Sequence, residues 1–308
     1  MLTHDGYVAL PEHTGKGGFD HAAVHAATGH VYVAHTANNA VDVLDPAARR
    51  HIFSIPDLPG VAGVVICDEW QLVIASNRAE NSIAIFAPGP DPRIAKIAVG
   101  MRPNGLACDP ARWLILAANV GDAAIPGSCT LSVVGLDERR LLAEIPVPGR
   151  TRWVVYDAEA EAFYVNIADP PQIVVVASRD PRRVAQSFAV PAAGPHGLDL
   201  DFASRRLFCA CDAKTLVTLD ANSGRIEGWH ALSGVPDVVF LNSRRGHLYV
   251  AVGDPGVIDV FDTATMERLE SVRTEEGAHT LAFSPASDGV CAFLPRTHRA
   301  ALYQDRED

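Results

Sequence analysis

The chain has 308 residues, of which 48% are hydrophobic, so it can bury a substantial core as one large domain or two ordinary ones. Its formal net charge of −11 at pH 7 argues against nucleic acid or an anionic membrane as a partner. No run of about 18 apolar residues occurs, so no transmembrane helix is predicted.

The cysteines and the first residues bear on the compartment. The six cysteines form no C-x-x-C or zinc-ribbon pattern, and we expect free thiols in a reducing environment. Residues 1–6 lack the basic and apolar segments of a secretory signal. We therefore expect a cytoplasmic protein, or a periplasmic one whose signal has been removed.

One repeating unit organises the chain. Residues 29–35 read GHVYVAH, and residues 246–252 read GHLYVAV. The segments that follow them, 40–45 and 256–262, read AVDVLD and GVIDVFD. We predict a unit of four short strands: one that ends in a polar residue, the "YVA" strand, the "VxVxD" strand, and one of alternating polarity.

The remaining units follow this plan less closely. Further second strands are expected at 72–77, 114–119, 163–166, 207–211 and 290–293, and further third strands at 82–86, 130–134, 172–176 and 215–219. Seven units emerge with the period of a four-stranded propeller blade, roughly 40–45 residues. The sequence therefore predicts an all-β, seven-bladed β-propeller that forms a single domain over residues 1–308.

The two ends of the chain complement one another. The last unit stops after its third strand, at residues 300–303, and a spare strand at residues 6–10 precedes the first complete unit. Pairing these strands would complete the seventh blade and remove two exposed sheet edges. We expect the N-terminal strand to close the ring in this way.

The repeat motifs resemble those of the YVTN-repeat propellers. The resemblance rests on the "YVA" strands, on VDVLD at 41–45, and on the strand entries RPNGLACDP at 102–110 and GPHGLDLD at 194–201. It covers essentially the whole chain, although the second strands often lack the Thr-Asn ending of that family, and the third unit has an enlarged loop at 120–128. These motifs are structural, so the resemblance implies a WD40-like ring and leaves the activity open.

The first strand of each unit is expected to line the central channel. Aligning the seven first strands without gaps places one column of side chains at the channel mouth: Asp20, Gly63, Asn104, Arg152, His196, Asp237 and His279. A slip of one residue in the first unit would replace Asp20 by His21. Because the fifth, sixth, seventh and first blades are consecutive in a closed ring, His196, Asp237, His279 and Asp20 or His21 should converge on one arc.

This arc is suited to more than one kind of chemistry. Imidazole and carboxylate groups are ligands for a divalent transition metal, so a metal site is predicted. The same groups can act as general acid and base, with Arg152 neutralising an anionic substrate and Asn104 facing them across the opening. His35, at the end of the first "YVA" strand, is a further candidate for ligand contact. Polar residues are also expected at a channel mouth because it holds water.

Three functions remain open at this point. The first is a binding propeller whose axial pocket holds a small molecule or a divalent metal ion. The second is a non-catalytic scaffold that presents its rim, for instance the 120–128 loop, to a protein partner. The third is a lactonase- or lyase-type enzyme, by analogy with other propellers. The sequence predicts no oligomeric state.

Overall fold

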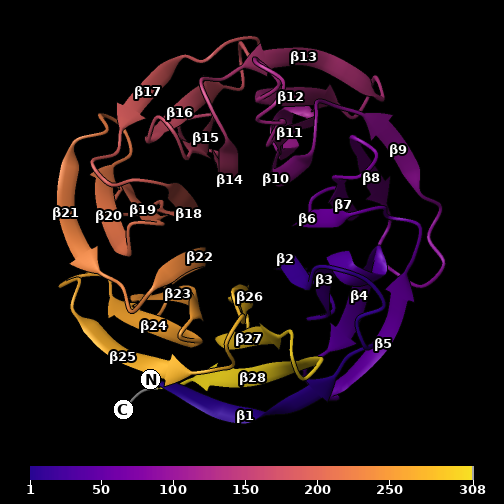
Figure 1. Cartoon of the computed structure of the whole chain (residues 1–308), viewed down its shortest axis with the longest axis vertical. Coiled ribbons are helices and arrows are strands. Elements are labelled where there is room, and N and C mark those ends of the chain that lie inside the picture. The colour runs from indigo at the N-terminus through magenta and orange to yellow at the C-terminus, as the bar shows by residue number, and fades with distance from the viewer. Residues whose placement is uncertain (307–308) are drawn as a thin grey trace.

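A computed structural model describes residues 1–306 as a ring of seven four-stranded antiparallel sheets around a central channel (Figure 1). Each sheet is one blade, and the predicted seven-bladed β-propeller is confirmed. In the described residues the only helices are two short 3₁₀ turns, Thr36–Asn38 and Pro110–Arg112. None of the helices in this part of the chain has the length and apolar character needed to cross a membrane.

In the first six blades the strands follow chain order from the channel to the rim. Blades one to three comprise β2 (Phe19–Val24), β3 (Val31–His35), β4 (Ala40–Asp45) and β5 (Arg50–Ile55); β6 (Val61–Cys67), β7 (Leu72–Asn77), β8 (Ser82–Phe86) and β9 (Ala95–Ala98); and β10 (Pro103–Asp109), β11 (Leu114–Asn119), β12 (Thr130–Gly135) and β13 (Arg140–Pro146).

Blades four to six follow the same plan. They comprise β14 (Thr151–Asp157), β15 (Ala162–Ile167), β16 (Gln172–Ala177) and β17 (Gln186–Ala189); β18 (Pro195–Asp201), β19 (Arg206–Cys211), β20 (Thr215–Asp220) and β21 (Ile226–Ala231); and β22 (Val235–Asn242), β23 (His247–Asp254), β24 (Val257–Asp262) and β25 (Arg268–Arg273).

The burial of each strand explains its sequence. A blade lies between two neighbouring blades, so its second and third strands are covered on both faces and read as continuous apolar runs, as in β3 and β8. The outermost strands face solvent on one side, and β21 and β25 alternate between more and less exposed residues. The core is therefore a set of clusters between blades rather than one central core.

The seventh blade is assembled from both ends of the chain. It comprises β26 (Thr280–Ser284), β27 (Gly289–Leu294), β28 (Arg299–Asp305) and, at the rim, β1 (Leu2–Ala9). Strand β1 pairs antiparallel with β28, as the sequence predicts, and the pairing runs from Leu2 with Asp305 to Ala9 with Arg299. The strand begins earlier than the predicted residues 6–10.

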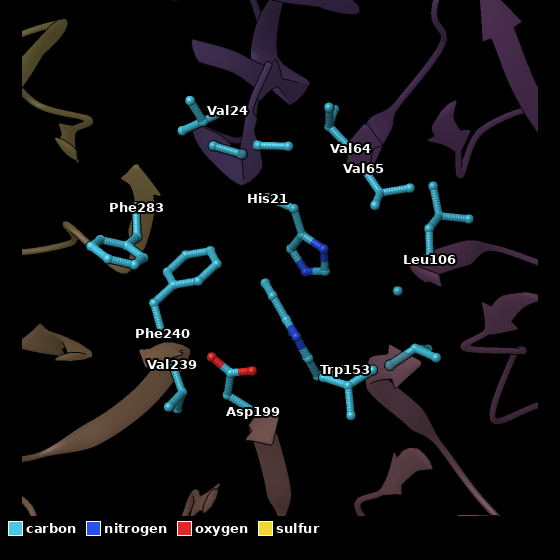
Figure 2. Close-up of a pocket in the computed structure, with 15 residues that line it drawn as sticks. His21, Val24, Val64, Val65, Leu106, Trp153, Asp199, Val239, Phe240 and Phe283 are labelled. Atoms are coloured by element: carbon cyan, nitrogen blue, oxygen red, sulfur yellow. The ribbon is translucent and has the colours of Figure 1, made fainter. Parts of the chain in front are cut away.

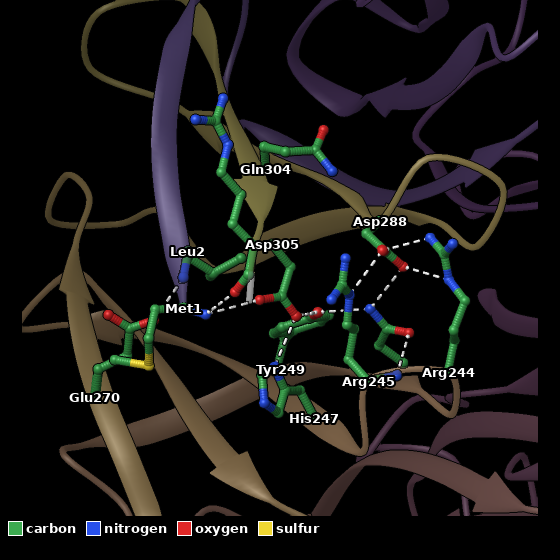
Figure 3. Close-up of polar contacts among 12 residues, drawn as sticks. Met1, Leu2, Arg244, Arg245, His247, Tyr249, Glu270, Asp288, Gln304 and Asp305 are labelled. Carbon is green, nitrogen blue, oxygen red and sulfur yellow. Dashed lines mark hydrogen bonds and ion pairs between the residues drawn. The ribbon is translucent and has the colours of Figure 1, made fainter. Parts of the chain in front are cut away.

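Polar contacts tie this seam to the sixth blade (Figure 3). Asp305 Oδ2 lies 2.7 Å from His247 Nδ1 and accepts a hydrogen bond from the Tyr249 hydroxyl group. The backbone N–H of Leu2 donates to Glu270 Oε1 over 2.7 Å. The closing strand pair is therefore anchored to β23 and β25 as well as to its own blade.

Candidate functional site

A β-bulge near the channel mouth shapes the innermost strands. In six blades the register shifts where two residues of the inner strand oppose one residue of the second strand. The shifts lie between Phe19 and Ala22, Val61 and Val64, Pro103 and Leu106, Thr151 and Val154, Pro195 and Leu198, and Pro236 and Val239. A bulge adds one residue and re-aims the side chains of the two residues that oppose one, and here residues from both positions line the channel cavities.

The first bulge position holds most of the predicted column. Asp20 follows Phe19 there, so the register places Asp20 in the column and His21 one residue further along. The second blade differs from the ungapped alignment. Cys67 of β6 pairs with Leu72 as Asp109 of β10 pairs with Leu114, so the turn after β6 starts one residue earlier than an ungapped alignment of the two strands places it. The column residue of this blade is therefore Ala62, and the prediction of Gly63 was wrong by one position.

Gly63 lies instead at the second bulge position, together with Gly105 and Gly197. A Cβ atom at these glycines would lie 2.0, 2.4 and 2.1 Å from the carbonyl oxygens of Asn104, Arg152 and Asp237, respectively, each in the next blade. The missing side chains let neighbouring inner strands approach closely. This approach brings the column residues together at the mouth.

A polar cavity of about 180 Å³ lies at this end of the channel. It is lined by Asp20, His21, Arg78, Asn104, Arg150, Arg152, Trp153, His196 and Asp237. The structure thus brings together six of the eight site residues proposed from the sequence, and a seventh, His279, contacts the group through Asp237.

Asp237 connects three successive blades. Its Oδ1 lies 3.2 Å from His196 Nε2, and its Oδ2 lies 2.8 Å from His279 Nδ1. Burial opposes a charge on Asp237, but the two histidines outweigh burial and hold the pKa of this carboxyl well below its usual range. Burial likewise lowers the pKa of His279, but Asp237 outweighs it and raises that pKa. The arc predicted from the sequence therefore contains a carboxylate paired with two histidine rings.

His196 has a carboxylate on each side. Its Nδ1 lies 2.8 Å from Asp212 Oδ1, opposite the contact with Asp237. Burial lowers the pKa of His196, but Asp237 and Asp212 outweigh burial and raise the pKa to about 9. At neutral pH the ring of His196 is therefore a cation.

A second contact of His196 depends on its proton state. Its Nε2 lies 3.0 Å from Arg152 Nη1 as well as 3.2 Å from the Asp237 carboxylate. A protonated Nε2 donates to Asp237, whereas an unprotonated Nε2 accepts from Arg152, and the two bonds cannot form at once. The proton state of His196 thus decides which neighbour it binds.

Arginine side chains make this mouth locally positive despite the negative net charge of the chain. Arg78 Nη1 lies 3.3 Å from Asp20 Oδ2, and Arg152 Nη2 lies 3.2 Å from Asp212 Oδ2. Arg150 forms no ion pair with any residue in the described range. Burial, and then the nearby guanidinium groups, lower its pKa.

An amide oxygen in the same wall also lacks a partner. Asn104 is 6% exposed, and its Oδ1 has no hydrogen-bond partner within residues 1–306. A buried polar atom without a partner is costly unless something else satisfies it. Asn104 lines the cavity, and its amide oxygen is an acceptor that no described residue satisfies.

Sequence reasoning missed several of these residues. Arg78 and Asp212 each come directly after the second strand of their blade, and Arg150 comes directly before the first strand of its blade. The alignment used only one column of the innermost strands. Extending it to the loops that enter and leave these strands would have found all three.

His35 does not line the mouth cavity. Its side chain is fully buried, its Nδ1 lies 2.6 Å from Asp42 Oδ2, and its ring packs against His13 at a centroid distance of 4.9 Å. His13 in turn contacts His298 of the seventh blade. The contacts of His35 therefore point to a role at the junction of blades one and seven.

The predicted metal ion stays a prediction. Within residues 1–306, no group of three or more His, Cys, Asp or Glu side chains has an arrangement that could hold a metal ion. The imidazole nitrogens of His196 are both engaged by protein groups.

Comparison with known proteins does not extend these conclusions: no protein-family model matches the chain, and no curated protein matches it.

Proposed function

We propose that the protein is a binding propeller whose axial mouth takes a small molecule carrying a carboxylate or phosphate group. The observation that carries the proposal is Arg150, a cationic side chain on the cavity wall that forms no ion pair within the described chain. The planar guanidinium group matches both kinds of anion through paired hydrogen bonds.

The rest of the mouth supports an anion that also has a hydrogen-bond donor. Arg152 and Arg78 line the same cavity, and His196 adds a further positive charge. The free Oδ1 of Asn104 calls for a donor such as a hydroxyl or amide N–H. A hydroxy acid or a sugar phosphate has both features, and a cavity of about 180 Å³ suits only a small one.

The same charges weigh against a divalent cation at this place, because guanidinium groups repel it. Elemental analysis of the purified protein and of the His196→Ala/His279→Ala double variant tests the metal alternative. A stoichiometric metal that is lost in the double variant would support it.

We also infer kinship with the YVTN-repeat propellers from the strand motifs, and this kinship leaves the identity of the ligand open.

Calorimetric titration with malate, citrate, glycerol phosphate and inorganic phosphate tests the anion proposal. Arg150→Gln should weaken binding of the best probe at least tenfold. Arg182→Gln is the matched control, because Arg182 is exposed in the loop between β16 and β17 and makes the same change of charge. Equal binding by both variants, or no binding of any probe, would contradict the proposal and favour a protein partner.

A further inference from the structure

A second cavity lies deeper in the channel. It has a volume of about 250 Å³ and shares His21 and Trp153 with the polar mouth cavity. The innermost strands all run away from the mouth, and Asp199 lies three residues beyond His196 on β18, about 10 Å further along the channel. We call this space the inner cavity.

The wall of the inner cavity is mainly apolar and aromatic (Figure 2). Trp153 contacts His21 at a ring-centroid distance of 4.2 Å and meets Phe240 edge-on at 6.3 Å. Phe283 adds a further ring from the seventh blade. Burial lowers the pKa of His21, so its imidazole adds a neutral ring to this wall at pH 7.

Asp199 places a carboxyl group at this apolar wall. Figure 2 shows this group pointing toward the middle of the ring of strands, on the same side as Trp153 and Phe240. It accepts hydrogen bonds from the backbone N–H groups of Leu200 and Leu241, over 2.8 and 2.7 Å. It forms no ion pair with any cationic side chain in residues 1–306. Burial raises its pKa to about 6, so at pH 7.5 it is charged and has no counter-ion.

We propose that the inner cavity binds a small organic cation, namely an ammonium group with methyl or other apolar substituents. The carboxylate of Asp199 would supply the opposite charge, and the faces of Trp153, Phe240 and Phe283 would attract the cation through their π electrons. The apolar substituents would fill the remaining wall of valine and leucine side chains.

Other ligands would interact favourably with only some of the residues that line the inner cavity. A neutral apolar molecule would leave the Asp199 carboxylate without a counter-ion, and a metal ion would find few oxygen ligands. The volume lies just below the roughly 300–1,000 Å³ of ordinary ligand pockets, so the cation must be small. The proposal is independent of the anion proposal, because it rests on different charged residues.

Calorimetric titration with choline and with its neutral carbon isostere, 3,3-dimethylbutanol, tests the proposal at pH 7.5. The wild-type protein should bind choline at least tenfold more tightly than the isostere. Asp199→Asn should weaken choline binding at least tenfold and leave binding of the isostere unchanged. The matched control is Asp201→Asn, which makes the same change on the same strand outside the inner cavity.

A second variant keeps the test decisive if Asp199→Asn does not fold. Phe240→Leu retains apolar bulk but removes an aromatic face, so it should weaken choline binding and spare the isostere. Arg150→Gln should leave choline binding unchanged even if it abolishes anion binding. Absent choline binding, equal binding of the isostere, or full choline binding by folded Asp199→Asn would each overturn the proposal.

Discussion

The rings of His21 and Trp153 meet inside the channel at a centroid distance of 4.2 Å, although they belong to blades one and four. Both residues occupy the second bulge position of their innermost strands, where Gly63, Gly105 and Gly197 stand in other blades. The glycines leave room at the axis, and the two rings fill it. This contact separates the polar mouth cavity from the inner cavity.

Loss of the Trp153 ring should destabilise the fold. We expect Trp153→Ala to lower the free energy of unfolding by about 2–4 kcal/mol, because the substitution merges the two cavities into one and removes the ring contacts of Trp153. Urea denaturation measures this change. Trp229 is the control, because it is 59% exposed on β21 and its replacement by alanine should cost less than about 0.5 kcal/mol. Equal losses in the two variants would show that the Trp153 contact contributes nothing specific.

The raised pKa of His196 makes stability depend on pH. Its pKa of about 9 in the folded state exceeds the ordinary 6.5, so protonated His196 stabilises the fold fully below pH 6.5. This stabilisation is lost as the pH rises through about 9. The stability difference between wild type and His196→Gln should therefore shrink between pH 6 and pH 9.5, by on the order of 2–3 kcal/mol.

Urea denaturation of both proteins at the two pH values measures this difference, and an NMR titration of the His196 ring gives its pKa directly. A difference that stays constant, or a ring that titrates near 6.5, would contradict the imidazolium assignment. Asp237 makes stability depend on pH in the opposite direction, because its pKa is lowered in the folded state. Its contribution to stability is present above pH 3.8 and is lost as the pH falls through the folded-state pKa.

The sequence was sufficient to predict the ring and its closure. The YVA segments at 32–34 and 249–251 recur because the second strand of each blade is covered on both faces and must be apolar along most of its length. The spare strand and the incomplete last unit each had an unpaired edge, and their pairing is the simplest way to satisfy both.

The site could be predicted only in part. Column positions follow from the repeat, so Asp20, His196 and Asp237 were placed correctly. The contact of His21 with Trp153 was not predictable, because it depends on the width of the channel between two distant blades. The position of Ala62 was missed because β6 ends at Cys67, one residue earlier than its counterparts, and an ungapped alignment cannot follow such a shift.

The half-buried carboxyl group of Asp199 should make stability fall as the pH rises. Its folded-state pKa of about 6 lies above the ordinary 3.8, so the folded protein binds this proton more tightly than the unfolded chain. Wild type should lose stability relative to Asp199→Asn between pH 4 and pH 7.5, by on the order of 1–3 kcal/mol. Urea denaturation at the two pH values gives this difference. The same difference at both would mean that Asp199 is not a strained carboxylate.

The closing seam should control the stability of the whole ring. Asp305 is 1% exposed and lies against His247 and Tyr249 of the sixth blade. Removing this carboxylate leaves the buried Tyr249 hydroxyl group, the half-buried His247 ring and the N-terminal ammonium group of Met1 without this partner, so Asp305→Ala should lower the free energy of unfolding by about 3–5 kcal/mol. Replacing the exposed Asp137 by alanine is the control and should change stability by less than about 0.5 kcal/mol.

The form of the transition distinguishes global loss from local fraying. Every blade packs against two neighbours, so opening the seam exposes the apolar faces of blades six, seven and one together. Asp305→Ala should therefore unfold in one cooperative transition with its midpoint at a lower urea concentration. The slope of the unfolding free energy against urea concentration should stay the same. An early separate transition, with the remaining ring melting at the wild-type midpoint, would show instead that the seventh blade detaches without opening the rest.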